Sequence, residues 1–458
     1  MSDNAKINSV LVWAIIASQF APPFMFSGVA VALPSMGLEL QAGAVALGLV
    51  ETLFLTSQLA FLLPVGRLAD AGDKRTLYKY AFFVFWVASL LIALSNSMTV
   101  VLALRFIQGI CSAVFASTGG AMIAELVPAE KRGHYYGYSI GAIYAGLAAG
   151  PLCAGLIVEH FGWRGLFYTG AGLLFAGHML MLAILKSKWR TPPRDTVHLP
   201  SAFLMAASVI GLVSGTAMIS ASVMGYLFIA IAFLFIIAFV VWQNRLEKPL
   251  LNIRKVKENI ALRNALLVQV LLYMNAFCAV FMLSIYMQVS LGHSANLTGQ
   301  ILAMGTVLML LIAPYAGRLS DRWRPRYVAT AGVACVVISS VMALFLNAET
   351  GLVYITLLLA LNGMGFGLFS TPNTTIIMGS VPQNFYGIAS ALAAKSRSVG
   401  MMAGMLVTSL LMSLHIGNEP VEKHAVKFMD IMHEAFIVLT IAAISAAILS
   451  YKGRRSSN

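Results

Sequence analysis

Residues 66–77 read GRLADAGDKRTL and form a short polar stretch between two long apolar runs, residues 45–65 and 78–95. Each run has about 20 residues, which is the length that a helix needs to cross the hydrocarbon core of a bilayer. We therefore predict that the polar stretch is a tight loop at a membrane surface and joins two spanning helices.

A second copy of this stretch lies far downstream. Residues 317–322 read GRLSDR and again stand at the end of an apolar run. Two copies of one loop indicate two similar halves, and internal repeats of this kind are typical of secondary transporters.

The composition excludes a soluble fold. Of the 458 residues, 59% are hydrophobic and only 10% are charged, whereas an ordinary soluble domain has about 25% charged residues. The apolar runs are long and do not alternate with polar residues, so they predict membrane-spanning helices rather than barrel strands.

The apolar runs predict about 14 spanning helices in an all-α polytopic membrane protein. We expect an N-terminal six-helix bundle over residues 1–186, cytoplasmic linkers with an inserted transmembrane hairpin over 187–261, and a C-terminal six-helix bundle over 262–458. The expected helices are residues 10–34, 45–65, 78–95, 98–125, 136–158 and 166–185, then 201–220 and 223–242 in the hairpin, then 266–291, 297–316, 327–347, 352–378, 388–414 and 434–449.

The net charge of +13 is a topology signal rather than a sign of a nucleic-acid partner. Most of the 30 Lys and Arg residues fall on the same side as residues 66–77, and only Arg164, Lys423 and Lys427 fall on the other. This positive-inside bias predicts a multi-pass protein of the cell inner membrane with both termini in the cytoplasm.

The polar stretch resembles the signature loop between the second and third helices of the major facilitator superfamily. The matching residues are Gly66, Leu68, Ala69, Asp70, Lys74 and Arg75. The chain departs from the pattern at Asp73, where the family has a later glycine. The resemblance implies a fold of two six-helix bundles and a loop that governs the inward–outward switch, through Gly66, Asp70 and Arg75 here and Gly317, Asp321 and Arg322 in the second copy.

The physical basis for such a switch is the acidic residue. Asp70 is expected to face the positive end of a helix and to pair with Arg75 or Arg318, which would latch the two halves together in one conformation. The plainer interpretation is a solvated loop that only obeys the positive-inside rule.

Two charges inside the apolar runs are the main candidates for a proton-coupling or substrate site, because an intramembrane charge is energetically unfavourable and marks function by default. Arg105 lies in the stretch LRFIQG with Gln108, and it matches a helix-4 motif in which the arginine is tied to proton coupling. Glu51 lies about two turns into its run and is a candidate for binding a proton or a cationic solute. The alternatives are a structural anchor for Arg105 and a hydrated position near the outer surface for Glu51.

Three further titratable residues lie within or near spans. Arg397 matches an arginine of the fourteen-helix drug/proton antiporter branch, and residues 365–400 also resemble that branch. Lys395 is additional, and both cations have an alternative as side chains that snorkel to the surface. His178 titrates near neutral pH when exposed, but a lone intramembrane histidine is more often a packing residue.

Prolines and glycines predict broken or closely packed helices. Pro22 and Pro23 should break the first helix, and broken helices of transporters line cavities. Gly146, Gly150, Pro151 and Gly155 predict a kink and close helix approach, and they resemble the motif that marks exporter branches. The drug-antiporter branch often has an aspartate before the segment that resembles residues 29–34, whereas residues 25–28 read MFSG here, without an acid.

These features together predict a secondary active transporter of a small organic solute, with proton-coupled export of drugs or metabolites favoured by the resemblance. The alternative is a carrier of an anionic solute such as an organic acid or carboxylate siderophore, because Arg105, Lys395 and Arg397 outnumber the acids. A membrane sensor or scaffold is a third interpretation.

We find no catalytic constellation or nucleotide-binding loop, so we expect no enzyme activity. The four cysteines, in apolar runs, suggest no metal site and we expect no cofactor. The expected partners are the solute, protons and the lipid bilayer, with a monomer as the default.

Overall fold

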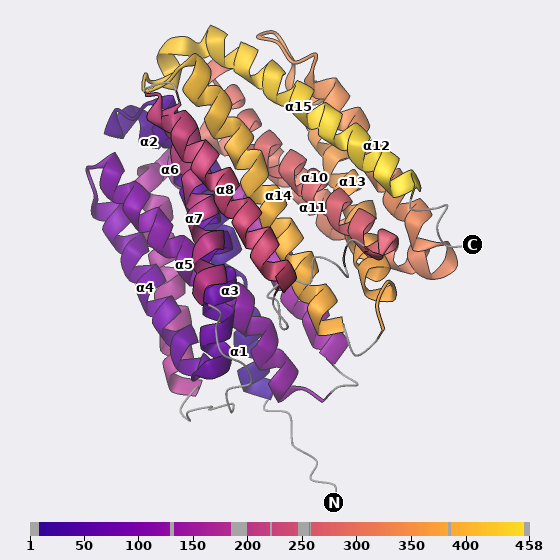
Figure 1. The fold of residues 1–458 in the computed structure, drawn as a ribbon. Coiled ribbons are helices and arrows are strands. Elements are labelled where there is room, and N and C mark those ends of the chain that lie inside the picture. The colour runs from indigo at the N-terminus through magenta and orange to yellow at the C-terminus, as the bar shows by residue number, and fades with distance from the viewer. Residues whose placement is uncertain are drawn as a thin grey trace, which may run out of the picture.

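The computed structural model describes residues 9–128, 132–184, 199–219, 222–245, 256, 258–382 and 386–452. Over these ranges the chain consists of helices joined by short turns, without a strand (Figure 1). The α-helices are α1 (Ser9–Ser18), α2 (Ala21–Leu40), α3 (Ala44–Ala71), α4 (Lys74–Leu94), α5 (Met98–Leu126), α6 (Arg132–Ile184), α7 (Leu199–Met218), α8 (Met224–Arg245), α10 (Ile260–Ile285), α11 (Ala295–Arg322), α12 (Pro325–Ala343), α13 (Leu352–Gly379), α14 (Tyr386–His415) and α15 (Ala425–Lys452). A π-helix, η2 (Tyr286–Ser290), extends α10, and a 3-10 turn, η4 (Val421–His424), precedes α15.

The predicted all-helical membrane architecture is confirmed. Among the described residues, twelve helical segments are long and apolar enough to cross a membrane. One of them, Tyr135–Ile184, has 50 residues and contains a break at Gly162, whose φ of 69° is a conformation that favours glycine. Counting its two parts separately, and adding the shorter apolar stretch Phe203–Met218 of α7, brings the total to about 14.

The helices pack in two groups. In the first, α2 packs on α6, α3 on α5, and α4 on both α5 and α6; in the second, α13 packs on α11 and α12, and α10 packs on α14 and α15. Figure 1 shows the indigo-to-purple helices of the first group beside the orange-to-yellow helices of the second. The main contacts between the groups are α6 with α11 and α3 with α14.

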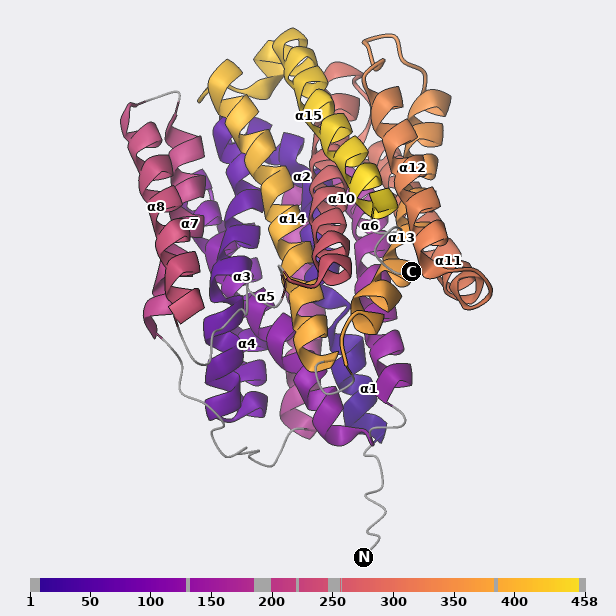
Figure 2. The same ribbon diagram turned by 45° about the vertical axis from the view of Figure 1, so that its right-hand side comes forward.

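The hairpin α7–α8 lies at the edge of the molecule (Figure 2). Helix α7 packs on α3 from the first group and on α14 from the second. Helix α8 packs on α7, and few of its side chains are buried. Among its described residues, those that are buried are Gly225, Ala232 and Gln243. The hairpin therefore covers one seam between the two groups, while its outer helix presents apolar side chains on the surface.

The two groups meet closely at one end of the molecule. We name this the outer end, which carries residues 41–43 and 416–420, and we name the opposite end, which carries residues 72–73 and 323–324, the inner end. At the outer end the backbone amide of Ala44 donates to Glu419 O at 2.9 Å, and that of Val45 donates to Gly417 O at 3.3 Å. Residues 417–419 thus add backbone hydrogen bonds across the two groups.

The loop predicted over residues 66–77 is shorter in the structure. Helix α3 continues through Ala71, and only Gly72 and Asp73 separate it from α4. In the second copy α11 likewise continues through Arg322 before the turn. The reason is that both copies contain good helix formers, so the helices extend past the apolar run instead of ending with it.

Two other boundaries also differ from the expected ones. The first helix breaks at residues 19–20, ahead of Pro22 and Pro23, because proline is tolerated in the first turn of a helix, here α2. Helix α15 begins at Ala425 instead of near residue 434, so the outer loop is shorter than expected. The first turns of α15 contain the charged residues Lys427 and Asp430, so the apolar pattern placed the start of the helix after them.

Candidate functional site

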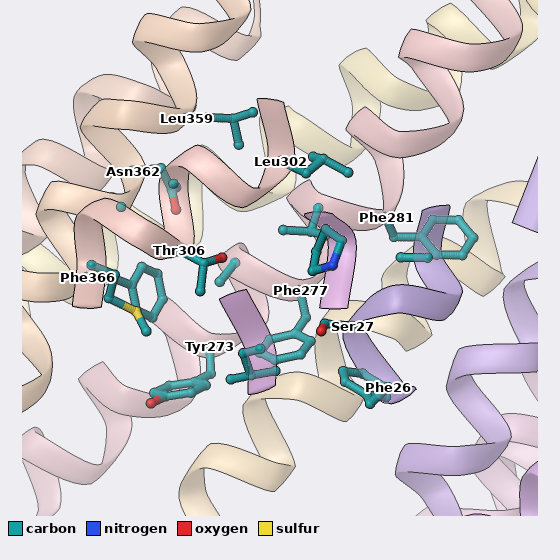
Figure 3. Close-up of a pocket in the computed structure, with 18 of the residues that line it drawn as sticks. Phe26, Ser27, Tyr273, Phe277, Phe281, Leu302, Thr306, Leu359, Asn362 and Phe366 are labelled. Atoms are coloured by element: carbon teal, nitrogen blue, oxygen red, sulfur yellow. The ribbon is translucent and has the colours of Figure 1, made fainter. Parts of the chain in front are cut away.

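A cavity of about 120 Å³ lies between the two groups of helices (Figure 3). Glu51 of α3 is one of the residues that line it. The cavity wall is mostly apolar, and six aromatic side chains contribute to it: Phe26, Tyr144, Tyr273, Phe277, Phe281 and Phe366. The helices α2, α3 and α6 supply one side, and α10, α11, α13 and α14 supply the other. Glu51 is the one charged residue in this wall among the described residues.

Glu51 is buried, with a side-chain exposure of 3%. Its Oε2 atom accepts a hydrogen bond from Arg105 Nη2 at 3.3 Å. Its Oε1 atom is buried and has no hydrogen-bond partner among the described residues. An ionised carboxylate with a bare buried oxygen is unfavourable in a medium of low dielectric constant, so this arrangement suits a carboxyl group that holds a proton.

Arg105 is buried completely and is held from four directions. Apart from its contact with Glu51, Nε donates to Val50 O at 3.1 Å and Nη1 donates to Gln108 Oε1 at 3.0 Å. Its guanidinium carbon also lies 4.6 Å from the centre of the Phe54 ring, which is a cation–π distance. These contacts keep the cation in place whether or not Glu51 carries charge.

Gln108 extends this network away from the cavity. Its Nε2 donates to Ser89 Oγ at 2.9 Å, and Ser89 in turn donates to Phe85 O at 2.9 Å. The structure therefore brings together three of the residues singled out from the sequence, Glu51, Arg105 and Gln108, in one buried polar cluster between α3, α4 and α5.

The opposite wall carries two uncharged polar side chains. Asn362 of α13 and Thr306 of α11 both line the cavity, and Figure 3 shows them beside Phe366. Neither side chain forms a hydrogen bond within the described part of the chain. Neither residue was predicted as part of a site, because a single uncharged polar residue in an apolar run does not indicate which way it faces.

A hydroxyl cluster joins the two groups at the inner side of the cavity. Tyr144 OH of α6 lies 2.9 Å from Ser370 Oγ of α13 and 3.3 Å from Tyr273 OH of α10. Both tyrosines line the cavity, so this cluster forms part of its wall. This cluster was not predicted, since its three members are more than 90 residues apart along the chain.

The glycines predicted to allow close helix approach do so on two faces of α6. A Cβ atom at Gly146 would lie 2.4 Å from Phe20 O, and one at Gly150 would lie 2.7 Å from Phe24 O, so these two glycines face the start of α2. A Cβ atom at Gly155 would lie 2.8 Å from Ala295 O of α11. The helix-kink motif therefore takes part in packing both within one group and between the groups, and Pro151 also lines the cavity.

The residues of the predicted switch lie apart from the cavity, near the inner end. Gly66 and Gly317 leave ordinary space for a Cβ atom, and Arg322 is exposed. The side chains of Asp70 and Asp321 lie outside the described residues, so their pairing stays a prediction.

Asp73 lies in the turn between α3 and α4 and is the N-cap of α4. Its carboxylate accepts hydrogen bonds from the Arg75 amide at 3.2 Å and from the Thr76 hydroxyl at 2.6 Å. Lys74, next to it, pairs with Glu125 of α5 at 2.5 Å. The departure from the family pattern at Asp73 thus supplies the acid at the helix start, and Lys74–Glu125 is an ion pair that the sequence did not predict.

Three other candidates do not line the cavity. Lys395 and Arg397 lie on α14, and His178 lies on α6 with its ring 5.7 Å from Phe83. Within the described ranges no group of three or more His, Cys, Asp and Glu residues is placed to hold a metal ion. The cavity therefore offers one carboxyl group, two free polar side chains and a wall of aromatic rings.

Comparison with known proteins gives consistent matches. The family model described as Major Facilitator Superfamily matches residues 15–203, 199–405 and 265–456. The riboflavin transporter RibZ of Clostridioides difficile is 24% identical over 82% of this chain and 81% of that protein.

Two further relatives are exporters or drug transporters by their descriptions. The tetracenomycin C resistance and export protein of Streptomyces glaucescens is 25% identical over 85% of this chain and 73% of its own. The multidrug transporter MdtP of Bacillus subtilis is 23% identical over 92% and 78%. A solved structure, of the POT family transporter PepTSo, aligns with a TM-score of 0.68 and 15% identity over 97% of this chain and 98% of that chain.

Proposed function

Because the chain belongs to the Major Facilitator Superfamily, whose members it resembles over nearly its whole length, we propose that it is a proton-coupled exporter of small organic solutes. The single observation that carries the proposal is Glu51: a buried carboxyl group in the cavity wall, beside Arg105, with one oxygen unpartnered in the described structure. Relatives described as multidrug and export proteins support export.

The proposed cycle places the proton and the solute in competition for Glu51. When Glu51 is protonated, the cavity holds no net negative charge and the bound solute leaves. When it is ionised, Arg105 and a cationic or hydrogen-bonding solute stabilise the carboxylate. A ligand shifts the equilibrium between two states only by its difference in affinity for them, and this competition supplies that difference.

The cavity as it stands is too small for a drug-sized solute. Its volume of about 120 Å³ compares with roughly 300–1,000 Å³ for typical ligand pockets. We infer that the two groups of helices must move apart to admit a solute, which is the movement that alternating access requires. The closely packed outer end favours entry from the inner end.

The proposal also covers the location of the protein, its orientation in the membrane and its branch within the family. We place the protein in the inner membrane with both termini in the cytoplasm, so that the inner end faces the cytoplasm. We propose the division into residues 1–186, 187–261 and 262–458, which the grouping of the helices supports. We also propose membership of the fourteen-helix drug/proton antiporter branch, which the hairpin α7–α8 supports.

The test is flux in liposomes with an imposed pH gradient. We expect the gradient to drive movement of a lipophilic cationic dye, and we expect Glu51→Gln to abolish the gradient dependence. Glu349→Gln, which changes an exposed carboxyl group at the outer end, is the matched control and should keep wild-type flux.

Flux of a citrate-like anion in the same liposomes tests the alternative. Movement of the anion that is insensitive to Glu51→Gln but lost in Arg397→Ala would overturn the proposal in favour of a carboxylate carrier. The described lining of the cavity includes neither Lys395 nor Arg397, whereas it includes Glu51.

A further inference from the structure

The wall of the cavity opposite Glu51 is built to a pattern that the proposed function does not explain. Helices α11 and α13 cross so closely at Gly305 and Gly363 that a Cβ atom at Gly363 would lie 2.0 Å from Gly305 O. Both glycines line the cavity, so this part of the wall is bare backbone. Thr306 directly follows Gly305 on α11, and Asn362 directly precedes Gly363 on α13. Each of these polar residues therefore lies beside the crossing.

The polar groups at this crossing are free to bind a ligand. The Asn362 amide and the Thr306 hydroxyl both line the cavity, and neither has a partner in the described part of the chain. A polar group inside an apolar cavity is destabilising unless it is hydrogen-bonded. A solute that supplies those hydrogen bonds therefore gains affinity from them.

The aromatic rings nearby favour a flat solute. Tyr273 and Phe277 stand one turn apart on α10 with their rings within 16° of parallel, and Phe366 meets Tyr273 edge-on at 87°. Figure 3 shows Thr306, Asn362 and Phe366 on the same side of the cavity as the Tyr273 ring, with Phe277 next to it. Aromatic side chains in this arrangement stack with planar rings.

We propose that Asn362 and Thr306 determine substrate specificity by binding the hydrogen-bonding edge of a planar heteroaromatic solute whose ring carries a lactam or imide group. A primary amide such as that of Asn362 has an adjacent donor and acceptor, and it pairs with the N–H and C=O of a lactam through two hydrogen bonds. The Thr306 hydroxyl donates to the second lone pair of the same carbonyl. This inference rests on the proposed function, because it places the solute in the same cavity.

The test uses two small probes, 2-quinolone and N-methyl-2-quinolone, which differ only in the ring N–H. Their dissociation constants are measured by equilibrium dialysis with the full-length protein in lipid nanodiscs, and empty nanodiscs serve as the blank. Wild type should bind 2-quinolone the more tightly. A net gain of about 1 kcal/mol per hydrogen bond corresponds to a roughly fivefold change in affinity.

The two variants should give different patterns. Asn362→Leu, of nearly equal size, should weaken binding of 2-quinolone by at least about fivefold more than binding of the N-methyl probe, because both probes can accept a hydrogen bond at the carbonyl but only 2-quinolone can donate its ring N–H to the amide oxygen. Thr306→Val should weaken both probes, since both keep the carbonyl. Thr375→Val is the control and should change the affinity of neither probe, because Thr375 of α13 is exposed and its hydroxyl donates to Thr371 O of its own helix.

Equal weakening of both probes by Asn362→Leu would assign Asn362 to the shape or folding of the cavity and overturn the inference. So would binding of neither probe by wild type. In either case the proton-driven dye flux that tests the proposed function is measured separately, so its presence shows that the transporter proposal stands while the substrate class is wrong.

Discussion

At the scale of single residues, the guanidinium of Arg105 is the group on which the polar cluster depends. Its Nε, Nη1 and Nη2 atoms each donate a hydrogen bond to a different acceptor, on Val50, Gln108 and Glu51 respectively. A lysine in its place keeps the charge but has a single ammonium group, which does not reach all three acceptors in their fixed positions. Retaining the charge alone is therefore not conservative here.

We expect Arg105→Lys to lower the free energy of unfolding of the purified protein by about 2 kcal/mol or more, since each lost hydrogen bond to a charged group costs about 1.5–3 kcal/mol. Proton-driven flux should fall at least about tenfold, which corresponds to 1.4 kcal/mol. Flux in liposomes and unfolding in detergent measure the two effects. Arg245→Lys, at an exposed site at the end of α8, should match wild type in both.

A second residue-scale prediction concerns the cap of α4. Asp73→Ala removes the side-chain acceptor for the Arg75 amide and the Thr76 hydroxyl, and loss of a cap costs about 1 kcal/mol. Asp73→Asn keeps an acceptor and should retain most of the stability. Thermal unfolding of the two variants separates these outcomes, and equal stability of Ala and Asn would contradict the capping role.

At the scale of helices, the length and polarity of the apolar runs predicted the elements well. The spanning helices, the inserted hairpin and the break near Gly162 all follow from where apolar runs begin and end. The inner extensions of α3 and α11, and the early start of α15, do not follow, because a helix continues through polar residues once it leaves the bilayer. Hydropathy therefore marks the membrane crossing and not the helix.

The candidate site was predictable only in part, for a related reason. Glu51 and Arg105 stood out because a charge inside an apolar run is rare, and Gln108 followed from its place beside Arg105. Tyr144, Thr306, Asn362 and Ser370 did not, because uncharged polar residues are common in such helices. Which of them face the cavity depends on how seven helices from two groups pack, and no local pattern contains that.

The helix-scale prediction tests the contact between α6 and α11. A Cβ atom at Gly299 would lie 2.2 Å from Pro151 O, so Gly299→Ala must push the two helices apart. We expect it to reduce proton-driven flux at least about fivefold and to lower stability by about 1–3 kcal/mol, as overpacking does. Gly172→Ala on α6, where no atom lies within 4 Å, should leave flux and stability unchanged.

At the scale of the whole molecule, most of the hydrogen bonds between the two groups that involve described residues lie toward the outer end. Ser284 Oγ donates to Ala30 O at 2.7 Å, Gln288 Nε2 donates to Val31 O at 3.1 Å, and the amide of Asn296 donates to Glu159 Oε2 at 3.1 Å. Closer to the inner end, the two groups are joined by the hydroxyl contacts of Tyr144 with Tyr273 and Ser370. The structure is therefore closed at its outer end, and a change there should shift the equilibrium between its states.

Gly43 is the position that tests this most directly. Its φ of −73° and ψ of 166° are open to any residue, so alanine there introduces no backbone strain. A Cβ atom would nevertheless lie 2.1 Å from Asn418 O. The hydrogen bonds from Ala44 and Val45 to residues 417–419 would have to break to make room.

We expect Gly43→Ala to favour the state in which the outer ends separate. The measurement is labelling of a cysteine at Ser27, in the cavity wall, by a membrane-impermeant thiol reagent added from the outer side, in a background without the four native cysteines. Labelling should be at least about fivefold faster in Gly43→Ala, a shift of about 1 kcal/mol in the equilibrium. Gly351→Ala, also at the outer end and with no atom within 4 Å, is the matched control. Equal labelling rates in the two variants would show that the outer contact does not hold the molecule closed, because both add one methyl group to the same end and only one of them meets the opposite group of helices.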